Sequence, residues 1–355
     1  MKSIGISGWP GVAFLALVAS LGCSEHTPSH SEHARDFTAI LITDVGGLGD
    51  KGFNDSGWAG CLEAQRRLAE QGKRIEVKFI ESEEQTDYIA NLNTASERAD
   101  VVIALGFLIA DAVEQVARYN PATRYIFIDG QVQGANIASF DFHANEAAFL
   151  AGLLSAYVTQ TGVAGIIPGM DIPPVEAFAA GFRAGFLTGG RMRSREVRIL
   201  STTIGSFDDP VKAKSIALSL LNQNADILFQ LAGNSGLGVI EAVKDQPGRV
   251  FAIGVDIDQD DLAPGKILTS VLKRMDQIVA DQIVAAYEGK FQGGIYTAGL
   301  KDGAVGLTDM RHTRSCVPEE ALAAVQRARA AIVSGKITVP KTYAELETFN
   351  PPAVE

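Results

Sequence analysis

Short apolar segments alternate with longer segments of helical periodicity along the chain, and this alternation constrains the fold most strongly. Segments of strand length lie at 38–42, 74–80, 101–104, 124–128, 137–140, 162–167, 196–202, 227–229, 250–255 and 267–271. Helical patterns lie at 55–71, 86–97, 110–119, 145–160, 174–187, 209–223, 237–244, 275–289 and 319–334. Such alternation is typical of parallel sheets with helices on both faces. The strands are too many for one compact sheet in 355 residues, so we predict an α/β fold of two doubly wound lobes.

The chain is expected to pass from one lobe to the other near the strands at 137–140 and 267–271. We assign residues 37–140 plus 257–300 to the N-terminal lobe and residues 141–256 plus 301–350 to the C-terminal lobe. The proline-containing segment 338–355 is predicted to form a terminal strand and a tail. Two facing lobes would enclose a cleft, which is a favoured place for a ligand and for hinge closure.

The charge of the chain argues against one class of partner. Its formal net charge is -11, whereas a nucleic-acid-binding surface needs a basic patch, so we predict no nucleic-acid partner. Hydrophobic residues make up 46% and charged residues 21% of the sequence, which is typical of a chain that buries large cores.

The beginning of the chain resembles a secretion signal. An apolar segment at 12–19 is too short to span a bilayer. Cys23 lies four residues beyond its end and is preceded by the small residue Gly22. This arrangement resembles a bacterial lipoprotein cleavage site. We predict a signal peptide at 1–23, lipidation of Cys23, and a polar tether at 24–36. Ordinary signal cleavage and an uncleaved apolar tail are the alternatives.

Two further cysteines, Cys61 and Cys316, are far apart in the sequence and have no paired spacing. This excludes a zinc motif and a disulfide framework. Two partly buried thiols and a single bridge in an oxidising compartment are both open interpretations.

The strongest candidate for a binding loop follows the first predicted strand. Asp44 follows the apolar segment 38–42 after one residue, Thr43, and a glycine-rich stretch then leads to Phe53 and Asn54. Open α/β sheets bind ligands beyond the carboxyl ends of their strands, where a carboxylate accepts hydrogen bonds and an aromatic ring stacks on a planar group. Each of these residues also has a purely structural alternative: Asp44 as a turn residue, Asn54 as a helix N-cap, and Phe53 as a hydrophobic staple on its own helix.

Three more candidates occupy loops after predicted strands. Asp129 follows the strand 124–128, with turn chemistry beside Gly130 as its alternative role. Phe207 lies in a strand-to-helix loop of the second lobe, where it could stack on a planar ring from the opposite side to Phe53. Gly233 lies in a glycine-rich segment whose spacing differs from a dinucleotide fingerprint, and its backbone could approach a sugar closely.

Asp256 and Lys273 complete the candidate set. Asp256 ends a strand and is placed to accept hydrogen bonds from sugar hydroxyls, while Lys273 could donate to ligand oxygens and pair with Asp256. Lys273 as a solvated surface lysine is the alternative. The acidic run that begins at Asp256 lacks the glycine and glutamate of a calcium loop, because Asp261 and Ile267 stand there. We therefore predict no metal and no cofactor.

Several segments together resemble one known family, in order along nearly the whole chain after the predicted signal. These are TDVGG at 43–47, DKGFN at 50–54, NEAAFLAG at 145–152, GMDIP at 169–173, FAAGF at 178–182, IGVDIDQ at 253–259 and TSVLKR at 269–274. They are similar to the signatures of the basic membrane protein family of bacterial lipoproteins, the purine-nucleoside receptors of ABC importers.

The resemblance implies a two-lobed fold like that of type I periplasmic binding proteins, with a three-crossover hinge. It implies that a purine nucleoside such as adenosine, guanosine or inosine is clamped between Phe53 and Phe207. By the same resemblance, the base is addressed by Asp44, Asn54 and Asp129, and the ribose by Gly233, Asp256 and Lys273. An ABC permease and an envelope location, anchored through Cys23 and facing the periplasm or the cell exterior, are also implied.

Two functions of other classes remain as alternatives. One is a nucleoside hydrolase, which would need a calcium-binding aspartate cluster after the first strand. That loop has only Asp44 and Asp50, and no histidine stands in it as a general acid. The other is a sensing or adhesion lipoprotein with the same fold but without transport. We predict a binding protein that is not an enzyme.

Overall fold

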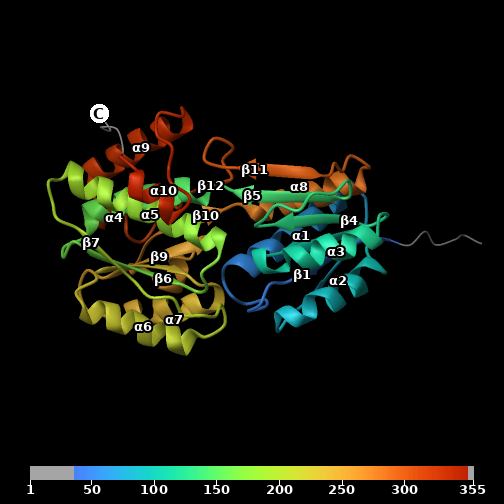
Figure 1. The fold of residues 1–355 in the computed structure, drawn as a ribbon, viewed down its shortest axis with the longest axis horizontal. Coiled ribbons are helices and arrows are strands. Elements are labelled where there is room, and N and C mark those ends of the chain that lie inside the picture. The colour runs from blue at the N-terminus through green and yellow to red at the C-terminus, as the bar shows by residue number, and fades with distance from the viewer. Residues whose placement is uncertain (1–35, 351–355) are drawn as a thin grey trace, which may run out of the picture. The chain divides into compact units, whose positions relative to one another are not determined.

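A computed structural model describes residues 36–350, which form two six-stranded sheets (Figure 1). The first sheet has the order β11-β5-β4-β3-β1-β2 and is parallel throughout. Its strands are β1 (Phe37–Ile42), β2 (Ile75–Ile80), β3 (Val101–Leu105), β4 (Arg124–Ile128), β5 (Ile137–Phe142) and β11 (Gly294–Ala298).

The second sheet has the order β12-β10-β9-β8-β6-β7. Only β12 runs antiparallel, against β10. Its strands are β6 (Val163–Pro168), β7 (Arg198–Ser201), β8 (Ile227–Leu231), β9 (Phe251–Asp256), β10 (Ile267–Lys273) and β12 (Val305–Leu307). The prediction of two parallel-sheet α/β lobes is confirmed.

Helices cover both faces of each sheet (Figure 1). The first lobe carries α1 (Phe53–Glu70), α2 (Tyr88–Ser96), α3 (Ala110–Tyr119) and α8 (Met275–Tyr287). The second carries α4 (Ala144–Val158), α5 (Pro173–Met192), α6 (Pro210–Asn222), α7 (Gly236–Lys244), α9 (Glu319–Val333) and α10 (Tyr343–Thr348). Short 3-10 turns lie at Gln85–Asp87, Phe107–Ile109, Gly233–Ser235, Asp260–Leu262 and Arg314–Cys316.

The layers follow from the two-residue period of buried strands. In β1, Ala39 and Leu41 pack with α1 and α8, whereas Ile40 and Ile42 face the opposite way and pack with α2 and α3. Side chains of successive strand residues point to opposite faces, so an all-apolar strand needs a helical layer on each side. This explains the near-continuous apolar runs in the sequence.

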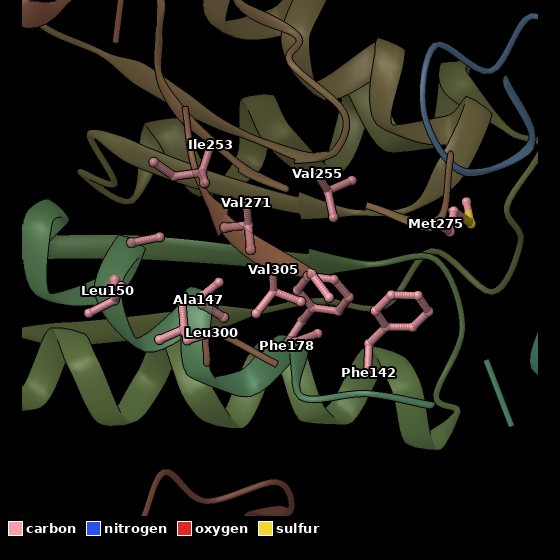
Figure 2. Packing of buried hydrophobic residues seen from close by; sticks show 14 of the residues in the cluster. Phe142, Ala147, Leu150, Phe178, Ile253, Val255, Val271, Met275, Leu300 and Val305 are labelled. Carbon is pink, nitrogen blue, oxygen red and sulfur yellow. The ribbon is translucent and has the colours of Figure 1, made fainter. Parts of the chain in front are cut away.

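The core of the second lobe is built in the same way (Figure 2). Ile253 of β9 and Val271 of β10 face Ala147 and Leu150 of α4 across the interior. The mainly apolar α4 is buried along almost its whole length. It is covered by α5, which holds Phe178 at the edge of this cluster (Figure 2).

Helices α4 and α5 cross at unusually close range. A side chain at Gly181 or Gly185 of α5 would collide with the main-chain carbonyls of Asn145 and Phe149 in α4. Only glycine lets two helix backbones approach so closely. The contact fixes α5, whose first turns face the ligand cavity described below.

The chain passes between the lobes three times. It leaves the first sheet after β5 near His143, returns after β10 at Arg274, and crosses again between β11 and β12. The predicted division at residue 257 is wrong for β10, because this strand is hydrogen-bonded to β9 and β12 in the second sheet. Pairing partners decide the lobe of a strand, and they are not visible in its own sequence.

Three further differences from the sequence predictions are local. Strands β11 and β12 were not predicted, because β11 is largely exposed and β12 is only three residues long. The predicted terminal strand is instead the helix α10, whose first turn is capped by Thr342. Cys61 and Cys316 are free thiols rather than a bridge.

The segments expected to act at the membrane lie outside the described residues. These are the signal peptide at 1–23, Cys23 and most of the tether at 24–36. Within residues 36–350, no helix has the length and apolar character that crossing a bilayer requires.

Candidate ligand-binding site

A cavity of about 590 Å³, part of it open to solvent, lies where the carboxyl ends of the two sheets face each other. Loops after β1, β3 and β4 of the first sheet and after β6 to β10 of the second line it. All eight predicted ligand-binding residues are among the lining residues, namely Asp44, Phe53, Asn54, Asp129, Phe207, Gly233, Asp256 and Lys273. The structure thus brings together residues from seven separate points of the sequence, since Phe53 and Asn54 are neighbours.

Asp50 organises the loop that carries Phe53. Its carboxylate, 1% exposed, accepts hydrogen bonds from the main-chain amides of Gly52, Asn54 and Asp55 at 2.8–3.2 Å. These amides belong to the first turn of α1, which has no partner for them within the helix. Burial raises the pKa of Asp50, against the lowering effect of these amides.

Asp44 lines the cavity, and two protein donors hold its Oδ1. Its Oδ1 accepts from the Tyr88 hydroxyl at 2.5 Å and from the Val45 amide at 2.8 Å. Its Oδ2 lies against Gly106, where a side chain would collide with it. Burial raises the pKa of Asp44 to about 6, although the bonds from Tyr88 and Val45 act in the opposite direction.

Asn54 has a more structural role than its predicted contact with the base. Its Oδ1 accepts the main-chain amide of Asp44 at 2.9 Å, and its Nδ2 donates to Asp50 at 3.3 Å. The oxygen is therefore engaged within the protein, and one amide hydrogen is left for a ligand.

The two predicted stacking residues lie in opposite walls. Phe53 begins α1 in the first lobe, and Phe207 lies between β7 and α6 in the second. Phe207 is seated against Gly169 and Gly233, since a side chain at Gly169 would overlap its ring. Its carbonyl accepts from the Ser235 amide at 2.9 Å.

The rest of the cavity wall is mainly apolar. It is formed by Phe107 from the first lobe and by Ile172, Pro174, Val175, Phe178, Leu231 and Val255 from the second. Such a wall favours a flat, poorly hydrated group, whereas the carboxylates provide directional contacts at its edges.

Lys273 is the buried cation of the site. Its ammonium is 2.6 Å from Asp129 Oδ2 and 3.5 Å from Asp256 Oδ1, and the side chain is 2% exposed. It also lies 4.5 Å from the centre of the Phe53 ring, a distance typical of a cation–π contact. The predicted pairing with Asp256 is present, and the surface alternative for Lys273 is wrong.

The charges of this triad influence one another. Burial lowers the pKa of Lys273, but Asp129 and Asp256 outweigh burial and the net shift is upward, so the ammonium stays charged. Burial raises the pKa of Asp256 to about 6, although Lys273 acts to lower it. The site therefore contains a permanently charged donor next to a carboxylate that titrates near neutral pH.

The backbone is strained at both carboxylates of the triad. Asp129 has φ of 73° and Asp256 has φ of 67°, each at the point where a parallel strand ends. Residues other than glycine adopt this conformation at an energetic cost, which is commonly retained at functional sites. It turns the two side chains from opposite sheets toward the same ammonium.

Some residues that line the cavity or support its lining were not among the sequence candidates. Tyr88 has no local signal, because it reaches Asp44 from α2. Phe178 stands in the segment FAAGF at 178–182, whose resemblance to the family could have indicated it. Asp50 was recognised only as part of a motif, although the spacing Asp50 to Asn54 suits a carboxylate that caps a helix start.

The geometry does not offer a metal site. Among residues 36–350, no group of three or more His, Cys, Asp or Glu side chains is arranged to hold a metal ion. The four carboxylates that line the cavity (Asp44, Asp50, Asp129 and Asp256) instead contact amides, a tyrosine hydroxyl and Lys273.

Two parallel-sheet lobes, a three-crossover connection and a polar and aromatic cavity between them define a solute-binding protein. Comparisons with known proteins agree with this class. The family model Bmp, described as ABC transporter substrate-binding protein PnrA-like, matches residues 37–343. The chain belongs to this family of ABC transporter substrate-binding proteins, the basic membrane protein family that the sequence motifs resemble.

Individual relatives cover nearly the whole chain. The ABC transporter nucleoside-binding protein BmpA of Lactococcus lactis subsp. cremoris is 30% identical over 349 residues, which cover 93% of this chain and 97% of that relative. An uncharacterized lipoprotein of Pyrococcus abyssi is 32% identical over 321 residues, with coverage of 87% and 78%. A crystal structure of an ABC transporter solute-binding protein from Aeropyrum pernix K1 has a TM-score of 0.80 at 29% identity, covering 88% of this chain and 96% of that chain.

These relatives and the fold are those of substrate-binding proteins rather than enzymes. The hydrolase alternative is therefore not retained. The family also assigns the chain to ABC transport, which argues against a purely sensory or adhesive role.

We expect Lys273→Met to lower the free energy of unfolding of the unliganded protein by about 3 kcal/mol. Removing the ammonium leaves Asp129 and Asp256 buried without their cation, and breaking a buried pair costs about 3–5 kcal/mol. Urea denaturation would measure the change. The exposed Lys212→Met should change stability by less than about 0.5 kcal/mol. Equal stability of Lys273→Met and the unmodified protein would contradict the assigned role of the triad.

Proposed function

We propose that the protein binds purine nucleosides in the cavity between its lobes and delivers them to an ABC permease. The observation that carries this proposal is the convergence of eight residues from both sheets on one cavity. Aromatic rings stand in its opposite walls, and carboxylates stand beside a buried ammonium.

The walls suit a purine. Phe53 and Phe207 come from different lobes, so closure of the lobes would bring a ring onto each face of a bound heterocycle. Stacking contributes about 1–3 kcal/mol per base, whereas micromolar affinity requires about 8 kcal/mol. Polar contacts must therefore supply the remainder.

The carboxylates suit the hydrogen-bond donors of a nucleoside. Asp44 lines the cavity together with Phe53 and Asn54 from the same segment of the first lobe, and N–H groups of a base could donate to its carboxylate. Asp256 and Lys273 line the same cavity, where ribose hydroxyls could donate to Asp256 and Lys273 could donate to a ribose oxygen. Charge-assisted hydrogen bonds of this kind contribute about 1.5–3 kcal/mol each.

The names of relatives support the same ligand class. The Lactococcus lactis relative is described as nucleoside-binding, and the Pyrococcus abyssi relative as a lipoprotein. We therefore also propose that Cys23 carries a lipid and holds the protein at the cell envelope, facing the periplasm or the cell exterior. Adenosine, guanosine and inosine are the proposed ligands.

We expect the unfolded and refolded, ligand-free protein to bind at least one of adenosine, guanosine and inosine with micromolar or stronger affinity in calorimetry. Phe53→Ala and Asp256→Ala should each weaken binding at least about tenfold, which corresponds to about 1.4 kcal/mol. The exposed residues Phe79 and Asp245 offer matched controls, and Phe79→Ala and Asp245→Ala should leave affinity unchanged. No heat with any of the three nucleosides would refute the proposed function.

We expect nucleosides to bind at least about tenfold more tightly than the corresponding 5′-monophosphates. Four carboxylates and one ammonium line the cavity, so an added phosphate meets net repulsion and loses its hydration. Competition between inosine and inosine monophosphate for the same protein would measure the ratio. Equal affinities would show that the acidic lining does not select against phosphate.

Lowering the pH from about 7.5 to about 5 should weaken inosine binding about tenfold or more. The pKa values of Asp44 and Asp256 are about 6, so only about one tenth of each carboxylate remains ionised at the lower pH to accept hydrogen bonds. Burial raises both pKa values above those of the unfolded chain, so the folded state takes up protons first. The free energy of unfolding of the unliganded protein should therefore rise as the pH falls through this window. Calorimetry at both pH values would test this, with Asp256→Asn expected to give a flatter profile.

A further inference from the structure

One hydrogen bond joins the two lobes directly, outside the set of residues that line the cavity. The side-chain Nε2 of Gln259 donates to the main-chain carbonyl of Lys51 at 2.7 Å. Lys51 lies between β1 and α1 in the first lobe, and Gln259 follows β9 in the second. Gln259 is 2% exposed, so water has little access to compete with this bond.

The second lobe holds the Gln259 side chain in a fixed orientation. Its Oε1 accepts from the Val255 main-chain amide at 3.1 Å and from Gln230 Nε2 at 2.9 Å. The main-chain amide of Gln259 donates to Ser270 Oγ at 3.1 Å. A main-chain amide can only donate and a main-chain carbonyl can only accept, so the positions of oxygen and nitrogen in the side chain are unambiguous. The donor is therefore preorganised by residues of its own lobe.

The first lobe presents the acceptor with similar precision. Lys51 has φ of 50°, a conformation that costs energy for any residue but glycine. Its amide donates to Asp55 at 3.2 Å, and Asp50 accepts the amides of Gly52 and Asp55 on either side of Phe53. These contacts hold the carbonyl of Lys51 toward the second lobe.

The bond connects the two loops that carry the main ligand candidates. Lys51 and Phe53 share the β1–α1 loop and the start of α1, whereas Asp256 and Gln259 share the β9–β10 loop. Between them lies Gly52, whose Cβ position would be 3.8 Å from Gln259 Nε2 and 4.0 Å from Asp256 Oδ2. Formation of this hydrogen bond therefore sets the distance between Phe53 of one lobe and the Asp256 carboxylate of the other.

We infer that Gln259 is a positioning residue that latches the lobes together over the bound ligand and slows its release. This inference rests on the proposed function, because it concerns retention of the nucleoside in the same cavity. The latch exists only when the lobes are closed, since separation of the lobes removes Lys51 from Gln259 while the other bonds of Gln259 lie within one lobe. A contact present only in the closed state stabilises that state. It therefore lowers the rate of ligand dissociation rather than changing the rate of association.

Gln259 can be tested separately from the ligand contacts. The ion pair between Lys273 and Asp129 also joins the lobes, but both residues line the cavity and their substitution would change ligand contacts. Gln259 is not one of the lining residues. Its effect should therefore appear in the rate of release, without a change in which nucleoside is preferred.

The experiment is stopped-flow measurement of inosine association and dissociation with the full protein, freed of carried-over ligand by unfolding and refolding. Gln259→Glu keeps the acceptor oxygen and replaces the donor to Lys51, and Gln259→Asn keeps the amide but shortens its reach. We expect both variants to release inosine about fivefold faster, with association changed less than about twofold, as for the loss of one buried hydrogen bond.

Lys51→Ala is the matched control, because it removes a side chain that is 56% exposed and keeps the carbonyl that accepts the bond. It should release inosine at the rate of the unmodified protein. Unchanged release in both Gln259 variants, or a loss confined to association, would overturn the latch while leaving the proposed function intact. Failure of the unmodified protein to bind any purine nucleoside would instead overturn the proposed function, and the latch with it.

Melting of the unliganded proteins distinguishes a latch from a general stabilising role. The latch predicts that Gln259→Asn releases inosine faster at a temperature where the unliganded variant is fully folded. If faster release appears only in proportion to partial unfolding, the residue acts on the fold of its own lobe and the inference is wrong.

Discussion

The buried ammonium of Lys273 is the interaction on which the rest of the site depends. It stands within 2.6 Å of Asp129 from one sheet and 3.5 Å of Asp256 from the other, and both carboxylates are held by strained backbone. Without a cation between them, two carboxylates could not be buried at the same cleft. Lys273 also lines the cavity, so a group that stabilises the fold is part of the cavity wall.

The two lobes contribute different chemistry to the cavity. The first supplies a loop that Asp50 organises and that carries Phe53, together with the carboxylate of Asp44. The second supplies Phe207, the apolar first turns of α5 and the carboxylate of Asp256. Residues of both lobes line the cavity, so neither lobe forms it alone. Gln259 adds a contact that exists only in the closed arrangement.

Sequence reasoning predicted the architecture well, because its signals are local. Apolar segments such as β1 and β9 are buried on both faces, and this leaves a continuous apolar run in the sequence. Polar residues directly after those strands, such as Asp44 and Asp256, predicted the edge at which the cavity lies. Residues that reach the site from elsewhere, such as Tyr88 and Gln259, were missed because their contacts are long-range.

The sequence by itself determined most of the segments that become strands and helices, with β11, β12 and α10 as exceptions, and which polar side chains stand at the carboxyl ends of the strands. Only the tertiary structure decided that β10 joins the second sheet, that Asn54 contacts Asp44 rather than standing free, and that Lys273 is buried. The physical reason is the range of the interactions. Periodicity and turn chemistry act between neighbouring residues, whereas strand pairing, desolvation and charge pairing depend on which distant segments the fold brings together.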